Sequence, residues 1–330
     1  MKAIQISETG GPDVLKYVDL PTPRPGPGEV LVKAHAIGVC MPEIYVRKGV
    51  YRWMPPLPVI PGIEMSGTVV EAGSGVSRLR TGQNVWVTAR EFGERGGCYA
   101  EYVKARDDQP YPLPDGIDLD QAAGLANYQV AWHLLNSALK GFQYDSVLVV
   151  AAAGGVGTAL VQLAKAAGKR VIGVVSSGER GAFARGQGAD DVVDRKRGDV
   201  VDQVKGLTGG RGVDLVLDPA GGPNMTSYFG CLDRFGMLIL YGRIEGPPTG
   251  NIDAAIASPP WRSSAYRYFT MHTLDDWPEL RARCTHELIR LLANGTIKVP
   301  IHERIPLVEA ARAHRVFESG MVMGKLIMKP

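Results

Sequence analysis

SVLVVAAAGGVGTALVQLAKAAG, residues 146–168, carries the strongest fold signal in the chain. The run Ser146–Val150 is apolar and β-branched, as is typical of a buried parallel strand. Alanines and glycines follow it without a spacer. After Gly157, apolar residues recur at helical spacing: Leu160, Val161, Ala164 and Ala167. Gly168 stands where a left-handed cap ends a helix. The stretch predicts a strand, a tight turn and a helix.

The glycines of this turn occupy the positions of a dinucleotide fingerprint. Ala152, Gly154 and Gly157 match G-x-G-x-x-G with alanine at the first position, and Gly155 and Val156 lie between them. Backbone without side chains can approach a pyrophosphate, and a helix that starts near Val156 offers it free N–H groups. A glycine turn without a ligand is the alternative, but the strand and helix on either side favour a dinucleotide site.

Length and composition limit the class of protein. A chain of 330 residues exceeds the usual size of one core, so two domains are expected. With 45% hydrophobic and 22% charged residues, the composition is ordinary for a soluble globular protein. The net charge of +3 is spread over scattered basic and acidic residues. No run is long enough for a nucleic-acid footprint, so no nucleic-acid partner is expected.

Targeting and cysteine patterns favour a cytoplasmic protein. MKAIQISETGG lacks the apolar core of a signal peptide, and no window approaches a membrane span, so we expect no membrane partner. The four cysteines are far apart and form no C-x-x-C: Cys40, Cys98, Cys231 and Cys284. This spacing argues against a disulfide framework and against a structural zinc site.

Residues 1–120 predict a small β-barrel. Short β-prone runs are separated by glycine and proline turns: Lys2–Ile6, Glu29–Ala36, Ser66–Glu71 and Asn84–Val87. From Asp118 to about Gly141, apolar residues suit one or two helices.

Strands and helices then alternate. Further strands are expected at Arg170–Val175, Asp191–Val193, Val213–Asp218 and Met237–Tyr241. Helical segments are expected between them at Glu179–Gln187, Asp199–Leu207 and Asn224–Leu232. Regular alternation predicts an α/β fold with a doubly wound parallel sheet.

The tail does not continue this alternation. It predicts helices at Leu280–Ala293 and Leu307–Glu318, an extended segment at Ile297–Ile305 and a last strand at Gly324–Met328. Since no second parallel sheet can be built from these elements, we expect the tail to return to the first domain. The predicted domains are 1–122 with 269–330, and 123–268.

Several motifs, in this order, span almost the whole chain: GVCMPEIYVRKGVY, LPVIPGIEMSGTVVEAGSGV, CYAEYV, LPDGIDLDQAAGL, AAAGGVGTALVQLAKAAG, VDLVLDPAGG and AHRVFESGMVMGKLI. In these the chain resembles the medium-chain dehydrogenase/reductase superfamily, in its zinc-free quinone oxidoreductase (zeta-crystallin-like) branch. The resemblance implies a GroES-like β-barrel catalytic domain, a Rossmann domain and a homodimer built through the Rossmann sheet edge.

Zinc-dependent relatives carry a cysteine and a Gly-His-Glu sequence at the metal. Cys40 stands at the first of these positions, but the second is Gly62-Ile63-Glu64, and isoleucine cannot bind a metal. The four-cysteine lobe of these relatives is missing. A catalytic zinc needs three protein ligands, so no metal is expected.

The second strand of the nucleotide domain ends without an acid. An NAD site usually places Asp or Glu there for the ribose, whereas this strand ends Val174-Val175-Ser176-Ser177. The resemblance implies that Ser176, Ser177, Arg180 and Arg195 contact a 2′-phosphate, and therefore NADPH. Solvated surface is the alternative for both arginines. Tyr241 and Gly242, at the end of the fifth strand, complete the predicted cofactor residues.

The resemblance also places four residues at the acceptor: Cys40, Glu43, Tyr45 and Tyr51. Both tyrosines match the family, Glu43 is longer than the usual Asp, and Cys40 replaces Asn. A quinone or conjugated enone can take a hydride without a Lewis acid, which suits a site without zinc. Tyr51 and Tyr45 are candidates to bond the carbonyl or deliver a proton, with water as the alternative donor.

Two other functions remain open. One is an enoyl-thioester (enoyl-CoA) reductase, whose branch also has a tyrosine in the sequence Gly49-Val50-Tyr51. The other is a non-catalytic NADPH-binding protein with a structural or regulatory role.

Overall fold

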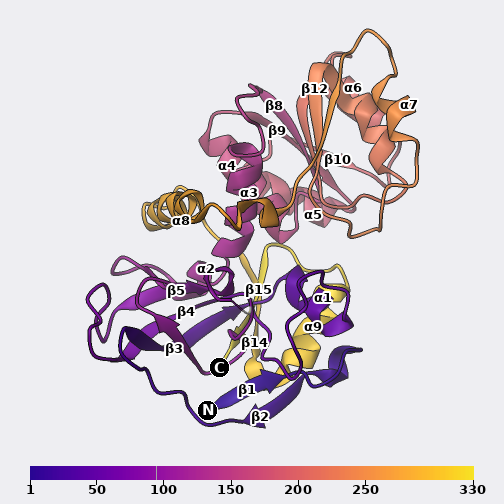
Figure 1. Ribbon diagram of the computed structural model, residues 1–330. Helices are drawn as coiled ribbons and strands as arrows, with labels where there is room; N and C mark the ends of the chain where they lie inside the picture. The colour runs from indigo at the N-terminus through magenta and orange to yellow at the C-terminus, as the bar shows by residue number, and fades with distance from the viewer. Residues whose placement is uncertain (94) are drawn as a thin grey trace. The chain divides into compact units, whose positions relative to one another are not determined.

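The chain folds into two compact units. The computed structural model, shown in Figure 1, describes residues 1–93 and 95–330. Unit 1 is Met1–Ala126 with Thr285–Pro330, and unit 2 is Asn127–Cys284. The sequence predicts the boundaries near residues 122 and 268. The second boundary lies later in the structure. The chain after strand β13 (Ala265–Tyr268), which pairs with strand β12 (Leu232–Leu240), still contacts unit 2, where Lys140 lies over the Trp277 ring and Arg283 over the Trp132 ring.

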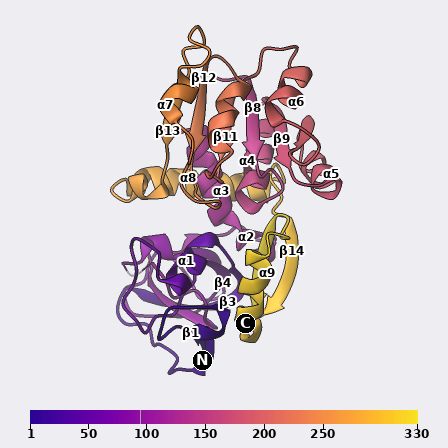
Figure 2. The ribbon, with the colours of Figure 1, turned by 90° about the vertical axis from the view of Figure 1, so that its right-hand side faces the viewer.

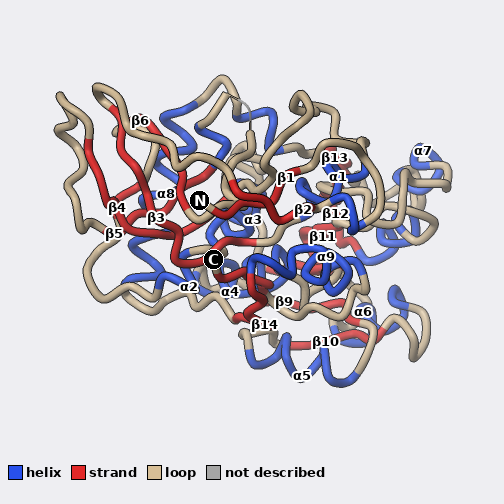
Figure 3. Tube along the Cα trace, turned by 90° about the horizontal axis from the view of Figure 1, so that it is seen from below, coloured by secondary structure: helices blue, strands red, loops and turns tan. Residues whose placement is uncertain are grey.

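Unit 1 is built on a seven-stranded sheet in the order β14-β15-β3-β4-β5-β7, with β6 pairing with β3. Its strands are β3 (Glu29–Gly38), β4 (Glu64–Ala72), β5 (Asn84–Thr88), β6 (Tyr102–Arg106), β7 (Tyr111–Pro112), β14 (Ile301–Pro306) and β15 (Lys325–Lys329). A smaller sheet pairs β1 (Lys2–Gln5) with β2 (Lys16–Asp19). Figure 3 shows β3 beside β4, its antiparallel partner. The tail returns to the first unit as predicted, since β15 pairs with β3.

The pattern of side chains explains these strands. In β3, Lys33 and His35 are exposed and alternate with the buried Val32, Ala34 and Ala36, as expected for a strand with one face on the core. Predicted strands overlap β1, β3, β4 and β5. Strands β2, β6 and β7 were missed because most of their residues are not buried and form no continuous apolar run.

Among the described residues, three short α-helices lie wholly in unit 1: α1 (Met41–Lys48), α2 (Leu119–Ala122) and α9 (Ala310–Glu318). Turns of 3₁₀ helix add η1 (Pro12–Val14), η2 (Ala89–Glu91) and η5 (Leu307–Glu309). Helix α9 packs against β14 and β15 (Figure 2). Helix α1 was not predicted, because its two turns are too short for a clear apolar period.

Unit 2 holds a six-stranded sheet in the order β10-β9-β8-β11-β12-β13. Each neighbouring pair is parallel. The strands not yet bounded are β8 (Ser146–Val150), β9 (Arg170–Val175), β10 (Asp191–Asp194) and β11 (Val213–Asp218). The prediction of a doubly wound parallel sheet is confirmed, while β13 was missed. Because the chain order reverses between β8 and β11, their carboxyl ends form the crevice where such sheets bind ligands.

The remaining helices are α3 (Leu125–Leu135), α4 (Gly155–Ala166), α5 (Gly178–Gly186), α6 (Val200–Leu207), α7 (Ile252–Ile256) and α8 (Pro278–Ala293), with 3₁₀ turns η3 (Met225–Cys231) and η4 (Met271–Leu274). Both unit boundaries fall inside helices, in α3 and α8. Within the described residues, every helix falls short of the length or apolar character needed to cross a bilayer.

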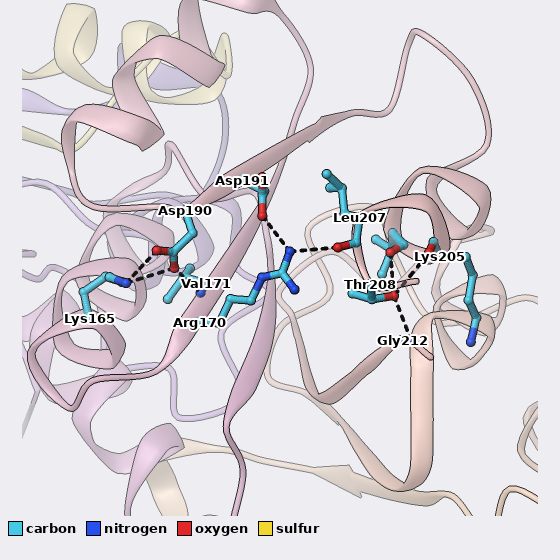
Figure 4. A network of polar contacts seen from close by, with 10 residues as sticks. Lys165, Arg170, Val171, Asp190, Asp191, Lys205, Leu207, Thr208 and Gly212 are labelled. Atoms are coloured by element: carbon cyan, nitrogen blue, oxygen red, sulfur yellow. Dashed lines mark hydrogen bonds and ion pairs between the residues drawn. The ribbon is translucent and has the colours of Figure 1, made fainter. Parts of the chain in front are cut away.

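Ion pairs fix the amino edge of this sheet (Figure 4). Lys165 at the end of α4 bonds the Asp190 carboxylate at 2.7 Å. Arg170 at the start of β9 bonds Asp191 of β10 at 2.9 Å and the Leu207 carbonyl oxygen of α6 at 2.8 Å. These contacts join two helices and two strands at the amino edge of the sheet.

Candidate functional site

The glycine turn lies at the carboxyl end of β8, as predicted. Ala151 has φ of 57°, a left-handed conformation that non-glycine residues rarely adopt, and Gly154 N donates to its carbonyl oxygen at 2.9 Å. Helix α4 begins at once, with Gly154 at its N-cap. At the other end Gly168 has φ of 72°, which confirms the predicted left-handed cap.

Close backbone contacts explain the fingerprint residues. A Cβ on Gly157 would lie 2.2 Å from the Ala151 carbonyl oxygen, so only glycine fits. Ala152, at the first position, is fully buried. It is accommodated because Gly173 of β9 faces it, where an added Cβ would lie 2.8 Å from the Ala152 Cβ.

The first turn of α4 presents unused donors. The first bond of the helix runs from Thr158 N to the Gly154 carbonyl oxygen at 2.8 Å. The N–H groups of Gly155, Val156 and Gly157 precede this bond and have no acceptor within the helix. Such a turn suits a phosphate, because its N–H groups and the helix dipole both favour negative charge.

The predicted 2′-phosphate residues come together at the ends of β9 and β10. Ser177 caps α5 by accepting the Arg180 N–H at 3.3 Å, which leaves its hydroxyl hydrogen available to a ligand. Arg195 N donates to the Val175 carbonyl oxygen at 3.0 Å, so its side chain starts next to Ser176. Arg195 also bonds Glu245 at 2.8 Å, and this hydrogen bond raises the pKa of the guanidinium. Sequence reasoning missed Glu245, which belongs to no motif.

The end of β12 adds the last cofactor residues. Tyr241 N donates to the Asp218 carbonyl oxygen at 2.9 Å, and a Cβ on Gly242 would lie 2.5 Å from the Pro219 carbonyl oxygen. The Tyr241 hydroxyl and the Thr158 hydroxyl are buried and have no hydrogen-bond partner among the described residues. Buried polar groups normally have partners, so these two atoms suit a bound polar ligand. With the glycine-lined approach, they fit a dinucleotide.

Asp218 was not singled out by the sequence, although it lies inside the VDLVLDPAGG motif. Its carboxylate accepts N–H groups from Ala220 at 2.8 Å and Gly221 at 3.2 Å. Burial raises the pKa of this carboxyl to about 6 despite these bonds. Asp218 therefore shapes the loop after β11 at the same edge.

In unit 1, Glu43 anchors the helix that carries Tyr45. The Cys40 N–H, at the N-cap of α1, bonds one carboxyl oxygen of Glu43 at 3.1 Å, and the Ile63 N–H bonds the other at 2.9 Å. Burial raises the pKa of this carboxyl to about 7. Glu43 thus holds the loop in place with both oxygens.

Cys40 belongs to a buried polar cluster that the sequence did not reveal. The Lys325 ammonium bonds the Cys40 sulfur at 2.9 Å and a Glu64 carboxyl oxygen at 2.6 Å. Burial opposes the charge on Lys325, but Cys40 and Glu64 outweigh it and raise the lysine pKa. Burial also raises the pKa of the Cys40 thiol well above its usual range. The ammonium therefore contacts both side chains and occupies the position that a metal ion bound to Cys40 and Glu64 would need.

The other Glu64 oxygen accepts Trp86 Nε1 at 3.3 Å and Ala126 N at 2.8 Å. Glu64 therefore connects β4, β5 and the first turn of α3. Within the described residues, no group of three histidine, cysteine, aspartate or glutamate side chains could hold a metal ion.

Tyr45 on α1 and Tyr51, which follows this helix, are both half-buried. The Tyr51 ring lies 5.9 Å from the Trp53 ring, and Arg95 lies over Trp53 at 5.8 Å. Burial raises the pKa of the Tyr51 phenol, while Arg90 and a hydrogen bond with Arg95 act to lower it. Arg90 and Arg95 were missed by the sequence analysis, which offered no spacing rule for them.

Family models match both parts of the chain. Residues 26–115 match the alcohol dehydrogenase GroES-like domain, and residues 155–284 match the zinc-binding dehydrogenase domain. A quinone oxidoreductase of Pseudomonas aeruginosa is 34% identical over 333 residues, covering 100% of this chain and 99% of the relative. The chain belongs to the quinone oxidoreductase branch of the medium-chain dehydrogenase/reductase superfamily.

Solved structures agree with this family. The Escherichia coli quinone oxidoreductase, solved with NADPH, has a TM-score of 0.88 and 30% identity, and each chain covers 100% of the other. A structure described as an NAD-dependent alcohol dehydrogenase has a TM-score of 0.89 and 30% identity, again with 100% of both chains covered. These two structures are about equally similar to the chain but are described with different cofactors. Overall similarity therefore does not identify the cofactor and the substrate, which have to be inferred from the residues of the site.

Proposed function

We propose that the chain is an NADPH-dependent reductase that transfers a hydride to a quinone or a conjugated enone without zinc. Similarity to quinone oxidoreductases over the full length supports the reaction. The observation that carries the cofactor is the end of β9, where Ser176 and Ser177 stand in place of the ribose-binding acid and Arg195 lies alongside.

The cofactor site of this proposal lies along the carboxyl edge of the unit 2 sheet. The N–H groups of Gly155, Val156 and Gly157 hold the pyrophosphate, with Ala152 and Gly154 shaping the turn. The 2′-phosphate is bound by Ser176, Ser177, Arg180 and Arg195, because hydroxyl and guanidinium donors suit a dianion. Tyr241 and Gly242 contact the cofactor beyond β12.

Zinc independence rests on the buried cluster of unit 1. A metal at Cys40 needs further ligands, but the Ile63 side chain has no ligand atom, and the Lys325 ammonium already bonds the Cys40 sulfur and the Glu64 carboxylate. Elemental analysis of the purified protein should find less than about one tenth of a zinc per chain. Stoichiometric zinc would contradict this part of the proposal.

The residues of unit 1 serve the acceptor. When bound, NADPH supplies a hydride, and the acceptor oxygen then needs a proton or a hydrogen bond. The Tyr51 phenol is the proposed donor, since Arg95 bonds it and its ring is fixed against Trp53. Tyr45 on α1 is the second donor, while Cys40 and Glu43 hold the start of this helix in place.

The main experiment measures both nicotinamides against a panel of quinones, enones and crotonyl-type thioesters. We expect turnover of quinones or enones with a KM for NADPH at least about tenfold below that for NADH. Equal constants would refute the cofactor assignment. Turnover of thioesters alone would establish the enoyl-thioester reductase, and binding without turnover would establish a structural or regulatory protein.

Replacing Tyr51 by phenylalanine tests the proton donor. The Tyr51→Phe variant should reduce enones about 100-fold more slowly, with NADPH affinity unchanged, because it removes the acid and leaves the cofactor edge intact. Tyr17→Phe, on the partly exposed strand β2, is the matched control and should keep full activity. An unchanged rate in Tyr51→Phe would remove Tyr51 from the mechanism.

We also propose a cytoplasmic homodimer that pairs along β13. This strand is the last of its sheet, with β12 as its partner on one side. Its last residue, Tyr268, is 50% exposed, and Trp261, which precedes the strand, is 63% exposed. Open edge strands of this kind pair readily with a second chain. Light scattering should give twice the chain mass, and Tyr268→Asp should shift the protein toward monomer. A monomeric wild type would refute the proposal.

A further inference from the structure

The ion pair between Arg195 and Glu245 crosses the carboxyl edge of the unit 2 sheet. Arg195 follows β10 and Glu245 follows β12, and three strands, β9, β8 and β11, lie between these two. Four strand spacings amount to about 19 Å. Since the two side chains nevertheless meet at 2.8 Å, the loops that carry them must lean toward each other over the ends of the central strands.

Backbone contacts anchor both ends of this pair. Arg195 N bonds the Val175 carbonyl oxygen at 3.0 Å, and Glu245 N bonds the Ala220 carbonyl oxygen at 2.9 Å. A Cβ on Gly222 would lie 2.8 Å from the Glu245 Cβ, so the loops after β11 and β12 are in close contact. The pair can therefore open by side-chain rotation while both loops stay in place.

Glu245 is placed to weaken the binding of a phosphate to Arg195. Its carboxylate satisfies the guanidinium that the proposed site assigns to the 2′-phosphate. Arg195 is 42% exposed and Glu245 33%, so a ligand can reach both side chains. A phosphate dianion that takes Arg195 must displace the carboxylate and also lies near its negative charge. A cofactor without the 2′-phosphate meets no such competition.

We propose that Glu245 is a specificity-determining residue, which competes with the 2′-phosphate for Arg195 and so limits the preference for NADPH over NADH. This inference rests on the proposed cofactor site. It predicts that neutralising Glu245 strengthens the binding of 2′-phosphorylated nucleotides and leaves other nucleotides unaffected.

Calorimetric titration with adenosine 2′,5′-bisphosphate and with adenosine 5′-monophosphate tests this inference without catalysis. In Glu245→Gln the bisphosphate should bind about fivefold to tenfold more tightly than in the wild type, as expected when one competing charged hydrogen bond is removed. The monophosphate should change by less than about twofold. An unchanged or weaker bisphosphate affinity would overturn the inference, as would equal tightening of both ligands.

Asp191→Asn provides the matched control. It breaks the Arg170–Asp191 pair, which has a length of 2.9 Å and exposures of 42% and 27%, in the same unit but at the amino edge. This variant should bind both nucleotides like the wild type. If it tightens the bisphosphate as much as Glu245→Gln does, net charge is the cause and the inference fails.

Arg195→Gln separates this inference from the proposed function. If it weakens the bisphosphate, the phosphate site stands and Glu245→Gln alone decides the inference. If it has no effect while the wild type prefers the bisphosphate, NADPH binding stands and the inference fails. If the wild type binds both nucleotides equally, the proposed cofactor fails and the inference with it.

Discussion

The two edges of the unit 2 sheet differ in how far their polar groups are satisfied by hydrogen bonds within the protein. At the amino edge, the polar groups that join the strands have close partners. One Asp214 oxygen accepts the Asp145 N–H at 2.9 Å and both the N–H and the hydroxyl of Ser146 at 2.8 Å. Lys165 and Arg170 form the ion pairs of Figure 4. These contacts favour the folded state, because each joins polar groups of neighbouring elements.

At the carboxyl edge, the same sheet holds features that cost stability. The hydroxyls of Tyr241 and Thr158 are buried and have no partner among the described residues, Ala151 is left-handed, and the Asp218 carboxyl is buried. An unsatisfied buried polar group costs roughly 1–3 kcal/mol. Such costs persist where a function depends on them. The comparison teaches that one edge stabilises the sheet while the other is kept ready for a ligand.

The largest effect is expected at the glycine turn. Gly157→Ala places a Cβ 2.2 Å from the Ala151 carbonyl oxygen, so the turn must shift. We expect a loss of roughly 3 kcal/mol in the free energy of unfolding and no measurable NADPH binding. Urea unfolding and fluorescence titration measure the two effects.

Gly178→Ala is the control for this substitution. Gly178 begins α5, and an added Cβ meets nothing within 4 Å. Its stability should stay the same or rise by about 0.5 kcal/mol, with NADPH binding retained. Equal losses in both variants would mean that crowding at the turn is not the cause.

A smaller effect is expected from two carboxyls at opposite edges. Burial acts to raise the pKa of Asp214, but hydrogen bonds from Asp145 and Ser146 outweigh it and lower the pKa below its usual value. Asp214 therefore adds stability above pH 4, which is lost as the pH falls further. Burial raises the pKa of Asp218 to about 6, so its contribution is present below pH 4 and lost as the pH rises to about 6.

Urea unfolding from pH 3 to pH 8 checks these signs. Asp214→Asn should lose roughly 1–2 kcal/mol at neutral pH and show a shallower decline in acid. Asp218→Asn should instead remove a decline in stability between about pH 4 and pH 6. The free energy of unfolding lost in each variant, relative to the wild type, should change with pH in opposite directions for Asp214 and Asp218. A change in the same direction for both would contradict the contrast between the edges.

The sequence predicted well those elements that are formed by residues close together in the chain. Strand β8, the turn and helix α4 are continuous in the chain, so their period and glycines identify them directly. The bounds of β9 and β11 were also correct, because each is a short apolar run between turn residues. What the sequence could not supply is the partner of a residue. Ala152 is acceptable because Gly173 on another strand faces it.

The same limit explains the missed side chains of the candidate site. Lys325 and Glu64 are separated by 261 positions in the chain, and Arg195 and Glu245 by 50. No spacing rule joins such pairs, since only the completed sheets bring them together. Cys40 could be placed by resemblance, but its neighbour Lys325 required the structure.

The smallest effect tests the unpartnered hydroxyl at the carboxyl edge. Tyr241→Phe removes a buried group without a partner, so the free protein should unfold at the same temperature or slightly higher. NADPH should bind about fivefold more weakly, because the ligand loses one hydrogen bond worth about 1 kcal/mol.

Tyr128→Phe is the control: its hydroxyl donates to Gln162 at 3.0 Å, so removing it should lower stability by about 1 kcal/mol and leave affinity unchanged. If Tyr241→Phe instead behaves like Tyr128→Phe, its hydroxyl serves the fold, and the carboxyl edge is not kept for a ligand at this position.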